Sequence, residues 1–158
     1  MTIQVGDRLP SVTFKVMGEK GPESFDTDAL FAGKKVVLFA VPGAFTPGCS
    51  VTHLPGFVVN ADKIKAKGVD SIICTAVNDA FVMDAWGKAQ NADEIIMAAD
   101  GSAEFARAIG LELDLTAGGL GVRSKRYAMI VNDGVVELLN VDEQGIDKSS
   151  AETILAAL

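Results

Sequence analysis

Cys49 is the residue whose position most clearly predicts chemistry. It lies in PGAFTPGCS (42–50), where an apolar run gives way to a proline- and glycine-rich corner. Thr46 is a favourable N-cap residue, and Pro47 suits the first helical position because an N–H there would have no intrahelical partner. Counting from Thr46 places Cys49 in the first helical turn, where free N–H groups and the helix dipole favour a thiolate. The sequence therefore predicts a reactive thiol at position 49 rather than a structural cysteine.

A three-residue pattern contains this cysteine. Pro42, Thr46 and Cys49 follow P-x-x-x-T-x-x-C, which resembles the active-site motif of the peroxiredoxins. The longer string PGAFTPGCSVTHLPGF is similar to their Prx5 branch (type II, atypical 2-Cys), and the similarity continues through AVNDAFVM (76–83) and GVRSKRYAM (121–129). The resemblance implies a peroxidase that reduces hydrogen peroxide and organic hydroperoxides through a cysteine sulfenic acid. It also implies recycling by a thiol reductant (glutathione, glutaredoxin or thioredoxin) and no cofactor.

The residues of the motif supply most of what peroxide reduction requires. A thiolate must attack one oxygen of a neutral peroxide while the O–O bond is polarised. Cys49 provides the thiolate, and Thr46, one helical turn earlier, can project its hydroxyl toward the sulfur, as a catalytic group, a helix cap, or both. The N–H groups of Gly48 and Cys49 are available because a helix start leaves them without intrahelical partners. Pro42 is expected to cover the site and exclude water.

The elements that must position these residues alternate between strand and helix. VVLFAV (36–41) is a continuous apolar run typical of a strand covered on both faces, and VDSIICTAV (69–77) predicts a second such strand. A helix from about 47 to 67 joins them into a βαβ unit with parallel strands. The remaining expected features are strands over 94–99, 126–131 and 135–141, a short helix over 102–109, and a glycine-rich loop over 116–121. With a final helix this is the thioredoxin-like order, so we expect one α/β domain over 1–158, with a mixed central sheet flanked by helices.

Shorter signals complete the expected fold. Residues 11–17 and 23–25 predict a small separate hairpin as an N-terminal extension. A helix capped near residue 79 is expected to reach about residue 90. Its predicted buried stripe consists of Phe81, Val82, Ala85, Trp86 and Ala89. Ser149 with Glu152 predicts a capping box for the C-terminal helix.

The cation that peroxide chemistry needs must come from another part of the chain. Arg126 opens a strand that, in a thioredoxin-like sheet, runs antiparallel to 36–41, so it starts at the edge where 36–41 ends. Arg126 also matches the arginine of the peroxiredoxin pattern. A guanidinium there would stabilise the thiolate and orient the peroxide through directed N–H bonds. Arg123 and Lys125 are the rivals for this role.

His53, the sole histidine, lies four residues after Cys49 and therefore on the same helical face. It has three interpretations: a supporting structural residue, a residue that lines the substrate pocket, or a general base. No third orienting group is evident from spacing. Pro55 is expected to kink this helix, because it cannot donate to the carbonyl of Val51.

Cys74 falls inside the second predicted strand, three residues before its end. At about 3.3 Å per residue, it lies roughly 10 Å below the edge expected for Cys49. A disulfide requires Cα atoms within about 7 Å, so a bond to Cys49 would require local unfolding of the helix start. In plant-like members of the resembling branch a second cysteine at this place is the resolving thiol, whereas other members use glutathione directly. Cys74 is therefore a possible resolving residue or a core residue.

Composition narrows the classes of partner. The 158 residues carry a formal net charge of −7 and are 49% hydrophobic and 22% charged, which is ordinary for a globular protein and unfavourable for nucleic acid or anionic membranes. The start MTIQVGDRLP lacks a signal-peptide pattern, so we expect a cytoplasmic, reducing compartment. One histidine and two cysteines are too few for a typical structural zinc site, so no metal is expected. A homodimer is the default expectation from the resemblance.

Two other functions compete with a peroxidase. A thioredoxin-like disulfide exchanger would carry C-x-x-C, but Thr46 occupies the place of its first cysteine. A non-enzymatic thiol sensor or holdase, whose output is binding to a partner protein, would not need both Thr46 and Arg126 around its thiol.

Overall fold

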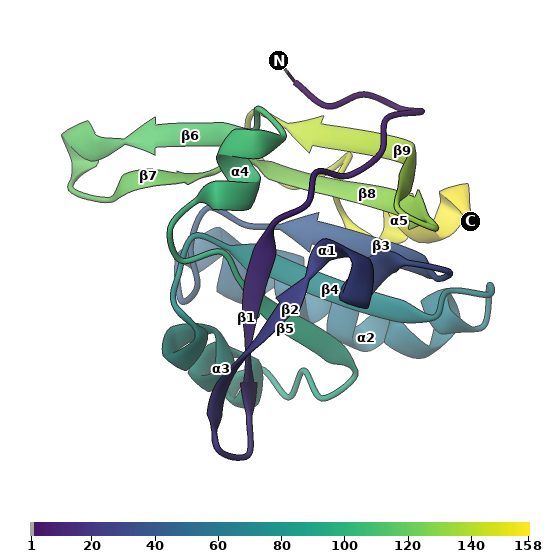
Figure 1. Ribbon diagram of the computed structural model, residues 1–158, viewed down its shortest axis with the longest axis horizontal. Coiled ribbons are helices and arrows are strands. Elements are labelled where there is room, and N and C mark those ends of the chain that lie inside the picture. The colour runs from purple at the N-terminus through teal and green to yellow at the C-terminus, as the bar shows by residue number, and fades with distance from the viewer. Residues whose placement is uncertain (1) are drawn as a thin grey trace.

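A seven-stranded mixed sheet organises the computed structural model, which describes residues 2–158 (Figure 1). The strand order is β2-β1-β5-β4-β3-β8-β9. The strands of this sheet are β1 (Thr13–Gly18), β2 (Gly21–Asp26), β3 (Lys35–Ala40), β4 (Ser71–Ala76), β5 (Ile95–Ala99), β8 (Arg126–Asn132) and β9 (Val135–Asp142). The helices are α1 (Thr27–Phe31), α2 (Leu54–Lys65), α3 (Ala80–Ala89), α4 (Glu104–Ala108) and α5 (Ala151–Ala157). The predicted α/β thioredoxin-like fold is confirmed.

The centre of the sheet is the parallel pair expected from the two apolar runs. β3 and β4 pair in parallel, with Phe39 opposite Cys74, and β3 pairs antiparallel with β8, with Ala40 opposite Tyr127. Arg126, one residue before Tyr127, therefore lies at the edge of the sheet where β3 ends. This register places Arg126 at the same edge as the loop that leads to Cys49.

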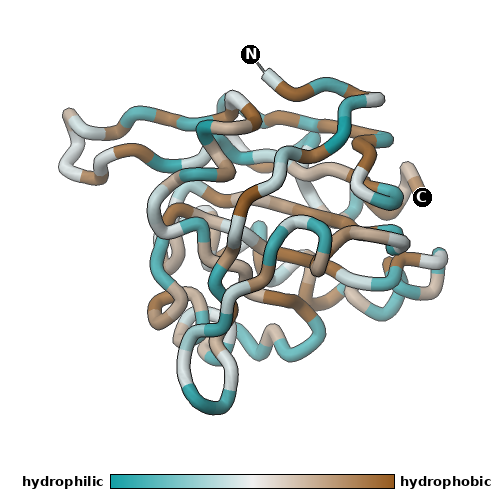
Figure 2. The backbone as a smooth tube through the Cα atoms, viewed as in Figure 1, coloured by the Kyte–Doolittle hydropathy of each residue, from teal (hydrophilic) through white to brown (hydrophobic). Residues whose placement is uncertain are grey.

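Helices cover both faces of the sheet and divide the core in two. One apolar cluster lies under α2, α3 and α5 and includes Phe39, Cys49, Phe57 and Trp86. A second cluster lies under α1 and α4, the helices drawn in front of the sheet in Figure 1, and includes Phe14 and Phe105. In Figure 2 the central strands are largely brown, which marks hydrophobic residues, and the tip of the β1–β2 hairpin is teal, which marks hydrophilic ones. No helix of residues 2–158 is both long and apolar enough to cross a membrane.

Two local predictions were wrong. The buried side of α3 consists of Ala80, Met83, Trp86 and Gly87, whereas Phe81, Ala85 and Ala89 of the predicted stripe are exposed and Val82 is half-buried. The helix is turned about its axis because it packs on β5 and β1 rather than on the sheet centre alone. The N-cap of α5 is Ser150, whose side chain accepts a hydrogen bond from the N–H of Thr153, so the Ser149–Glu152 capping box does not form. Ser149 instead donates its hydroxyl to Asp142.

Two hairpins differ from expectation in their attachment. The β1–β2 hairpin is not separate, because Lys15 of β1 pairs with Ala99 of β5 and joins it to the main sheet. The predicted glycine-rich loop over 116–121 joins two short strands that were not predicted, β6 (Glu112–Leu115) and β7 (Gly121–Ser124), which pair antiparallel and form an arm. Figure 1 shows this arm projecting from the body of the molecule.

Candidate active site

A helix starts directly after the loop that follows β3. The carbonyl of Thr46 accepts the first intrahelical hydrogen bond, from the N–H of Ser50 at 2.9 Å, which makes Thr46 the N-cap residue. Pro47 and Gly48 are helical, and Cys49 follows in the first turn. The N–H groups of Gly48 and Cys49 therefore belong to the turn whose donors have no preceding carbonyls.

The predicted kink near Pro55 takes the form of a π-helical turn, η1 (Cys49–His53). The N–H of Leu54 bonds to the carbonyl of Cys49, five residues earlier. Pro55 has no N–H for the carbonyl of Val51, so the helix widens over the preceding residues. The wide turn sets the direction in which the Cys49 and His53 side chains leave the helix.

Arg126 joins the thiol to the histidine. Its Nη2 donates to Cys49 Sγ at 3.1 Å, and its Nη1 donates to His53 Nδ1 at 2.8 Å. Cys49 and His53 are both buried, and the guanidinium also lies over Gly48, where an added Cβ would be 3.5 Å from Nη2. One nitrogen of the guanidinium thus donates a charged hydrogen bond to the sulfur, while its hydrogen bond to the imidazole fixes the other nitrogen in place.

His53 is in turn fixed from the C-terminal segment. Its Nε2 lies 2.8 Å from the carbonyl oxygen of Ser149. Because Arg126 can only donate and a carbonyl can only accept, the imidazole must be neutral with its proton on Nε2. Burial, the largest cause, and the nearby Arg126 charge lower the pKa of His53 from 6.5 to about 4, against an opposing effect of the Ser149 hydrogen bond. This geometry places His53 as a support of Arg126, since both ring nitrogens are already engaged.

Asp142 at the end of β9 holds the Ser149 segment. Its carboxylate accepts the hydroxyl of Ser149 at 2.7 Å and the backbone N–H groups of Asp147, Lys148 and Ser149. Burial raises the pKa of Asp142, but these hydrogen bonds dominate and lower it to about 2. One continuous chain of hydrogen bonds therefore runs from β9 to the thiol, through Asp142, Ser149, His53, Arg126 and Cys49.

The loop over 42–46 packs closely around the start of the helix. Thr46 donates its hydroxyl to the carbonyl of Gly43 at 2.6 Å, and Ala44 N–H donates to the Asn78 side chain at 2.9 Å. A Cβ on Gly43 would lie 3.1 Å from both Thr46 and the Arg123 guanidinium, so glycine permits this approach. Phe45 adopts a left-handed φ of 64°, which is unusual for a bulky residue and marks a tightly constrained turn.

A small cavity opens beside this loop. It has a volume of about 230 Å³, and Pro42 and Arg126 form part of its lining. The other lining residues are Leu113, Lys125, Asp142, Glu143, Gln144 and Gly145. Lys125 pairs with Glu143 at 3.5 Å at this rim, and Arg123 donates weakly, at 3.5 Å, to the carbonyl of Pro42. Of the three basic candidates, Arg126 alone donates to the Cys49 sulfur in the described chain.

Comparison with known proteins identifies the family of the chain. The Redoxin family model matches residues 4–155. Peroxiredoxin-2B of Arabidopsis thaliana is 49% identical over 99% of this chain and 98% of its own length. The chain belongs to the peroxiredoxins.

Solved peroxiredoxin structures share the whole fold. Reduced Prx3 of Vibrio vulnificus, in complex with hydrogen peroxide, is 58% identical, covers 99% of both chains and superposes with a TM-score of 0.96. Peroxiredoxin 5 of Alvinella pompejana is 37% identical, with a TM-score of 0.87 over 98% of this chain and 97% of its own. The resemblance to the Prx5 branch is thereby confirmed, and the chain is an enzyme, a thiol-dependent peroxidase.

The second cysteine of this peroxiredoxin lies in a different setting. Cys74 is fully buried in β4 between Phe39 and Met97, and it forms no disulfide. Burial, and secondarily the nearby Cys49, raise the pKa of the Cys74 thiol well above its ordinary value. The structure thus brings Cys49, Arg126 and His53 into contact, sets Pro42, Thr46 and Gly48 around them, and leaves Cys74 inside the sheet.

Several residues of the site carried no sequence signal. Asp142 ends β9, Ser149 lies in the segment after it, and both reach the site only through the tertiary fold. Asn78 and Phe45 act through the packing of the 42–46 loop. Ser50 accepts a hydrogen bond from Trp86 Nε1 at 2.9 Å, which ties the helix start to α3. Among residues 2–158, no group of three or more histidine, cysteine, aspartate or glutamate side chains is arranged to hold a metal ion.

Proposed function

We propose that this peroxiredoxin reduces hydrogen peroxide and organic hydroperoxides by nucleophilic attack of Cys49. The observation that carries the proposal is the hydrogen bond from Arg126 Nη2 to Cys49 Sγ at 3.1 Å. A fixed cationic donor stabilises the thiolate before reaction and remains in place for the charge that moves onto oxygen during it.

The reaction follows from the donors around the sulfur. The Cys49 sulfur attacks one peroxide oxygen, the O–O bond breaks, and the second oxygen leaves as water or an alcohol after gaining a proton. The sulfur is oxidised by two electrons to a sulfenic acid, and the peroxide is reduced by two. In this mechanism, Arg126 and the N–H groups of Gly48 and Cys49, which a helix start leaves without intrahelical partners, stabilise the negative charge that develops on the departing oxygen.

Thr46 has a defined part in this reaction. Its one hydroxyl proton is donated to the Gly43 carbonyl at 2.6 Å, so its oxygen presents only lone pairs to the site. It therefore accepts a hydrogen bond from the protonated oxygen of the peroxide and orients the substrate. Pro42 lines the cavity that Arg126 also lines, and in this mechanism it limits the entry of water to the thiol.

An external thiol completes the cycle. Glutathione, glutaredoxin or thioredoxin attacks the sulfenic acid, water leaves, and a second thiol reduces the resulting disulfide. An external thiol is favoured over Cys74 because Cys74 is fully buried and its raised pKa keeps it in the less reactive thiol form. Cys74 reaches Cys49 only when the helix start opens.

The chain acts as a homodimer in the cytoplasm under this proposal. Phe45 and Val51 flank the Cys49 turn with 56% and 75% of their surfaces exposed. Phe45 also lies on Trp86, with ring centroids 6.5 Å apart. Exposed apolar side chains beside an active site are typical of a protein–protein contact, and a second copy is the expected occupant. Sedimentation of wild type and Val51→Lys tests this, because a monomeric wild type would contradict it.

The function is tested by peroxide consumption with glutathione, glutaredoxin plus glutathione, and a thioredoxin system compared side by side. One equivalent of peroxide without reductant should yield a sulfenic acid on Cys49 that a dione reagent traps. Turnover without this adduct, or an adduct on Cys74 alone, would contradict the assignment.

A further inference from the structure

The β1–β2 hairpin is held to the main sheet by little backbone pairing. β1 and β5 share the single register pair Lys15–Ala99, whereas β4 and β5 share five. Side chains must therefore supply most of the attachment. On one face of β1, Phe14 packs against Phe105, and on the other face the hairpin depends on what packs between β1, β5 and α3.

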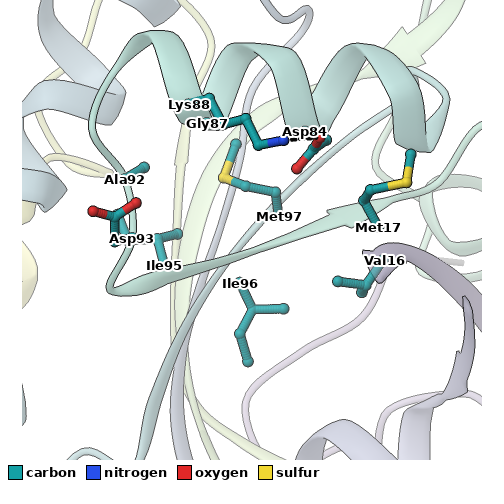
Figure 3. A pocket seen from close by; sticks show the side chains of 10 residues that line it. All are labelled: Val16, Met17, Asp84, Gly87, Lys88, Ala92, Asp93, Ile95, Ile96 and Met97. Carbon is teal, nitrogen blue, oxygen red and sulfur yellow. Dashed lines mark ion pairs between the residues drawn. The ribbon is translucent and has the colours of Figure 1, made fainter. Parts of the chain in front are cut away.

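Two methionines pack in the space between β1, β5 and α3. Met17 of β1 and Met97 of β5 line a cavity of about 240 Å³ beneath α3, and Figure 3 shows both thioethers directed toward the helix. Met97 fits against Gly87 so closely that an added Cβ there would lie 2.8 Å from Met97 Cγ and 3.5 Å from Sδ. The ion pair between Lys88 and Asp84, at 3.0 Å, stands at the rim.

The exposure of these two thioethers sets them apart from the two other methionines within residues 2–158. Met17 and Met97 are half-buried and face a cavity large enough for several water-sized molecules. Met83 and Met129 are 0% exposed in the two core clusters. A hydroperoxide can therefore reach Met17 and Met97 without any movement of the fold.

We propose that Met17 and Met97 form an oxidation site at which hydroperoxide loosens the β1–β2 hairpin. A sulfur lone pair attacks one peroxide oxygen, the O–O bond breaks, and an S–O bond forms. The second oxygen leaves as water or an alcohol after taking a proton. The thioether is oxidised by two electrons to a sulfoxide, and the peroxide is reduced by two.

The sulfoxide is incompatible with the present packing. It converts an apolar side chain into a polar one with an additional oxygen, and Met97 has no space for that oxygen on its Gly87 side. If the Met97 side chain turned outward, its sulfoxide oxygen could accept a hydrogen bond from Lys88, but the side chain would then no longer pack between β1, β5 and α3. The side of β1 that faces α3 then loses its packing, while Phe14 on the other side, 1% exposed and with its ring centroid 4.9 Å from that of Phe105, keeps β1 attached, so the hairpin loosens without detaching. A methionine sulfoxide reductase would restore the contact.

The experiment uses hydrogen peroxide on full-length protein carrying Cys49→Ser, so that the oxidant is not consumed at Cys49. Peptide mass spectrometry should show sulfoxide at Met17 and Met97 before Met83 and Met129. Hydrogen exchange should then show protection over 13–26 and 95–99 falling by roughly tenfold, the factor that accompanies about 1.4 kcal/mol of local stability. The Met17→Leu/Met97→Leu protein should keep its protection under the same treatment, because leucine fills a similar volume without the sulfur.

Matched variants separate this site from general oxidative damage. Met83→Leu should respond to peroxide as the parent protein does, and Met97→Gln should show the hairpin loss without peroxide. Equal oxidation of all four methionines, or sulfoxide at Met17 and Met97 with unchanged hairpin protection, would overturn the proposal. The result is independent of peroxidase turnover, since the variant used lacks the Cys49 thiol.

Discussion

Cys49 and Cys74 are equally buried, with 0% of either side chain exposed, yet their surroundings are opposite in kind. Cys49 lies in the first turn of a helix and accepts a hydrogen bond from a guanidinium. Cys74 lies in the middle strand of a sheet, with Phe39 and Met97 as its cross-strand neighbours. Low exposure alone therefore does not distinguish a reactive cysteine from a structural one.

The two positions differ in the groups that could stabilise a negative charge on the sulfur. At Cys49, Arg126 and the helix start stabilise a thiolate although water is excluded. At Cys74, burial raises the thiol pKa, and Arg126 opposes this only as the smallest of three effects. One apolar cluster thus contains two thiols, and of these two only Cys49 accepts a hydrogen bond from a cationic group.

The largest effect should come from removing the nucleophile. Cys49→Ser is expected to lower peroxide turnover at least a thousandfold, roughly the scale seen when the nucleophile of an enzyme is deleted. Circular dichroism should remain that of the wild type, because serine is of similar size. Turnover within a few-fold of wild type would remove the distinction between the two cysteines on which the assignment rests.

The next effect concerns the cation. Arg126→Ala should lower kcat/KM for peroxide by roughly a hundredfold, a typical cost of losing one charge-stabilising donor. Arg126→Lys should recover part of this loss, because a lysine restores charge but cannot donate to Cys49 and His53 with a rigid fork. Stopped-flow oxidation of Cys49 measures both variants.

Arg123→Ala is the matched control for the cation. Arg123 contacts only backbone carbonyls near the site, at 3.5 Å, so its loss should cost less than about tenfold. A larger loss from Arg123→Ala than from Arg126→Ala would reassign the arginine.

Cys49 and Thr46 could be predicted from a local rule, Arg126 from strand direction together with the peroxiredoxin resemblance, and Pro42 from the resemblance alone. The helix start comes from Thr46 and Pro47, and Arg126 reaches the same edge because β8 runs antiparallel to β3. The position of His53 near the thiol also followed from helical spacing. The contact of His53 with Ser149 did not, since Ser149 is separated from it by 96 residues.

Local patterns failed where tertiary packing selects among equivalent choices. Ser149 and Ser150 are both good N-caps, and the Asp142 carboxylate decides between them by binding Ser149. The helical period of α3 was correct, but which side is buried depends on its contact with β1 and β5. The β6–β7 arm lacks a long apolar run, because it projects from the core and has little to bury.

A smaller effect should appear in the pH dependence of stability. His53 has a pKa of about 4 in the folded protein and 6.5 ordinarily, so below pH 6.5 the unfolded chain binds the extra proton. Its contribution, about 3 kcal/mol, is fully present above pH 6.5 and is lost as the pH falls toward 4. Urea unfolding of wild type and His53→Gln at pH 7, 5.5 and 4.5 measures it, with the wild type showing the steeper decline.

The outcome for His53 also bears on the thiol. Protonated His53 would place a second cation against Arg126 and weaken the donor to Cys49. Asp142 titrates near pH 2, so it does not contribute within this window. Parallel declines in wild type and His53→Gln would show that the imidazole is not the group responsible.

The smallest effect is expected at Cys74. Cys74→Ala should leave glutathione-supported turnover within about twofold, because a small thiol attacks the sulfenic acid at the sheet edge without Cys74. A Cys49–Cys74 disulfide, detected in a non-reduced digest, should form only slowly when no small thiol is present. Its rate should rise in mild urea, because residues 47–53 must open before the buried thiol can reach the oxidised sulfur. The rate of glutathionylation of Cys49 should change little under the same conditions. The opposite result would be a disulfide that forms in native buffer as fast as the glutathione adduct, together with loss of turnover in Cys74→Ala. Cys74 would then be the resolving thiol, and the two cysteines would differ in the step of the cycle at which they react rather than in whether they react.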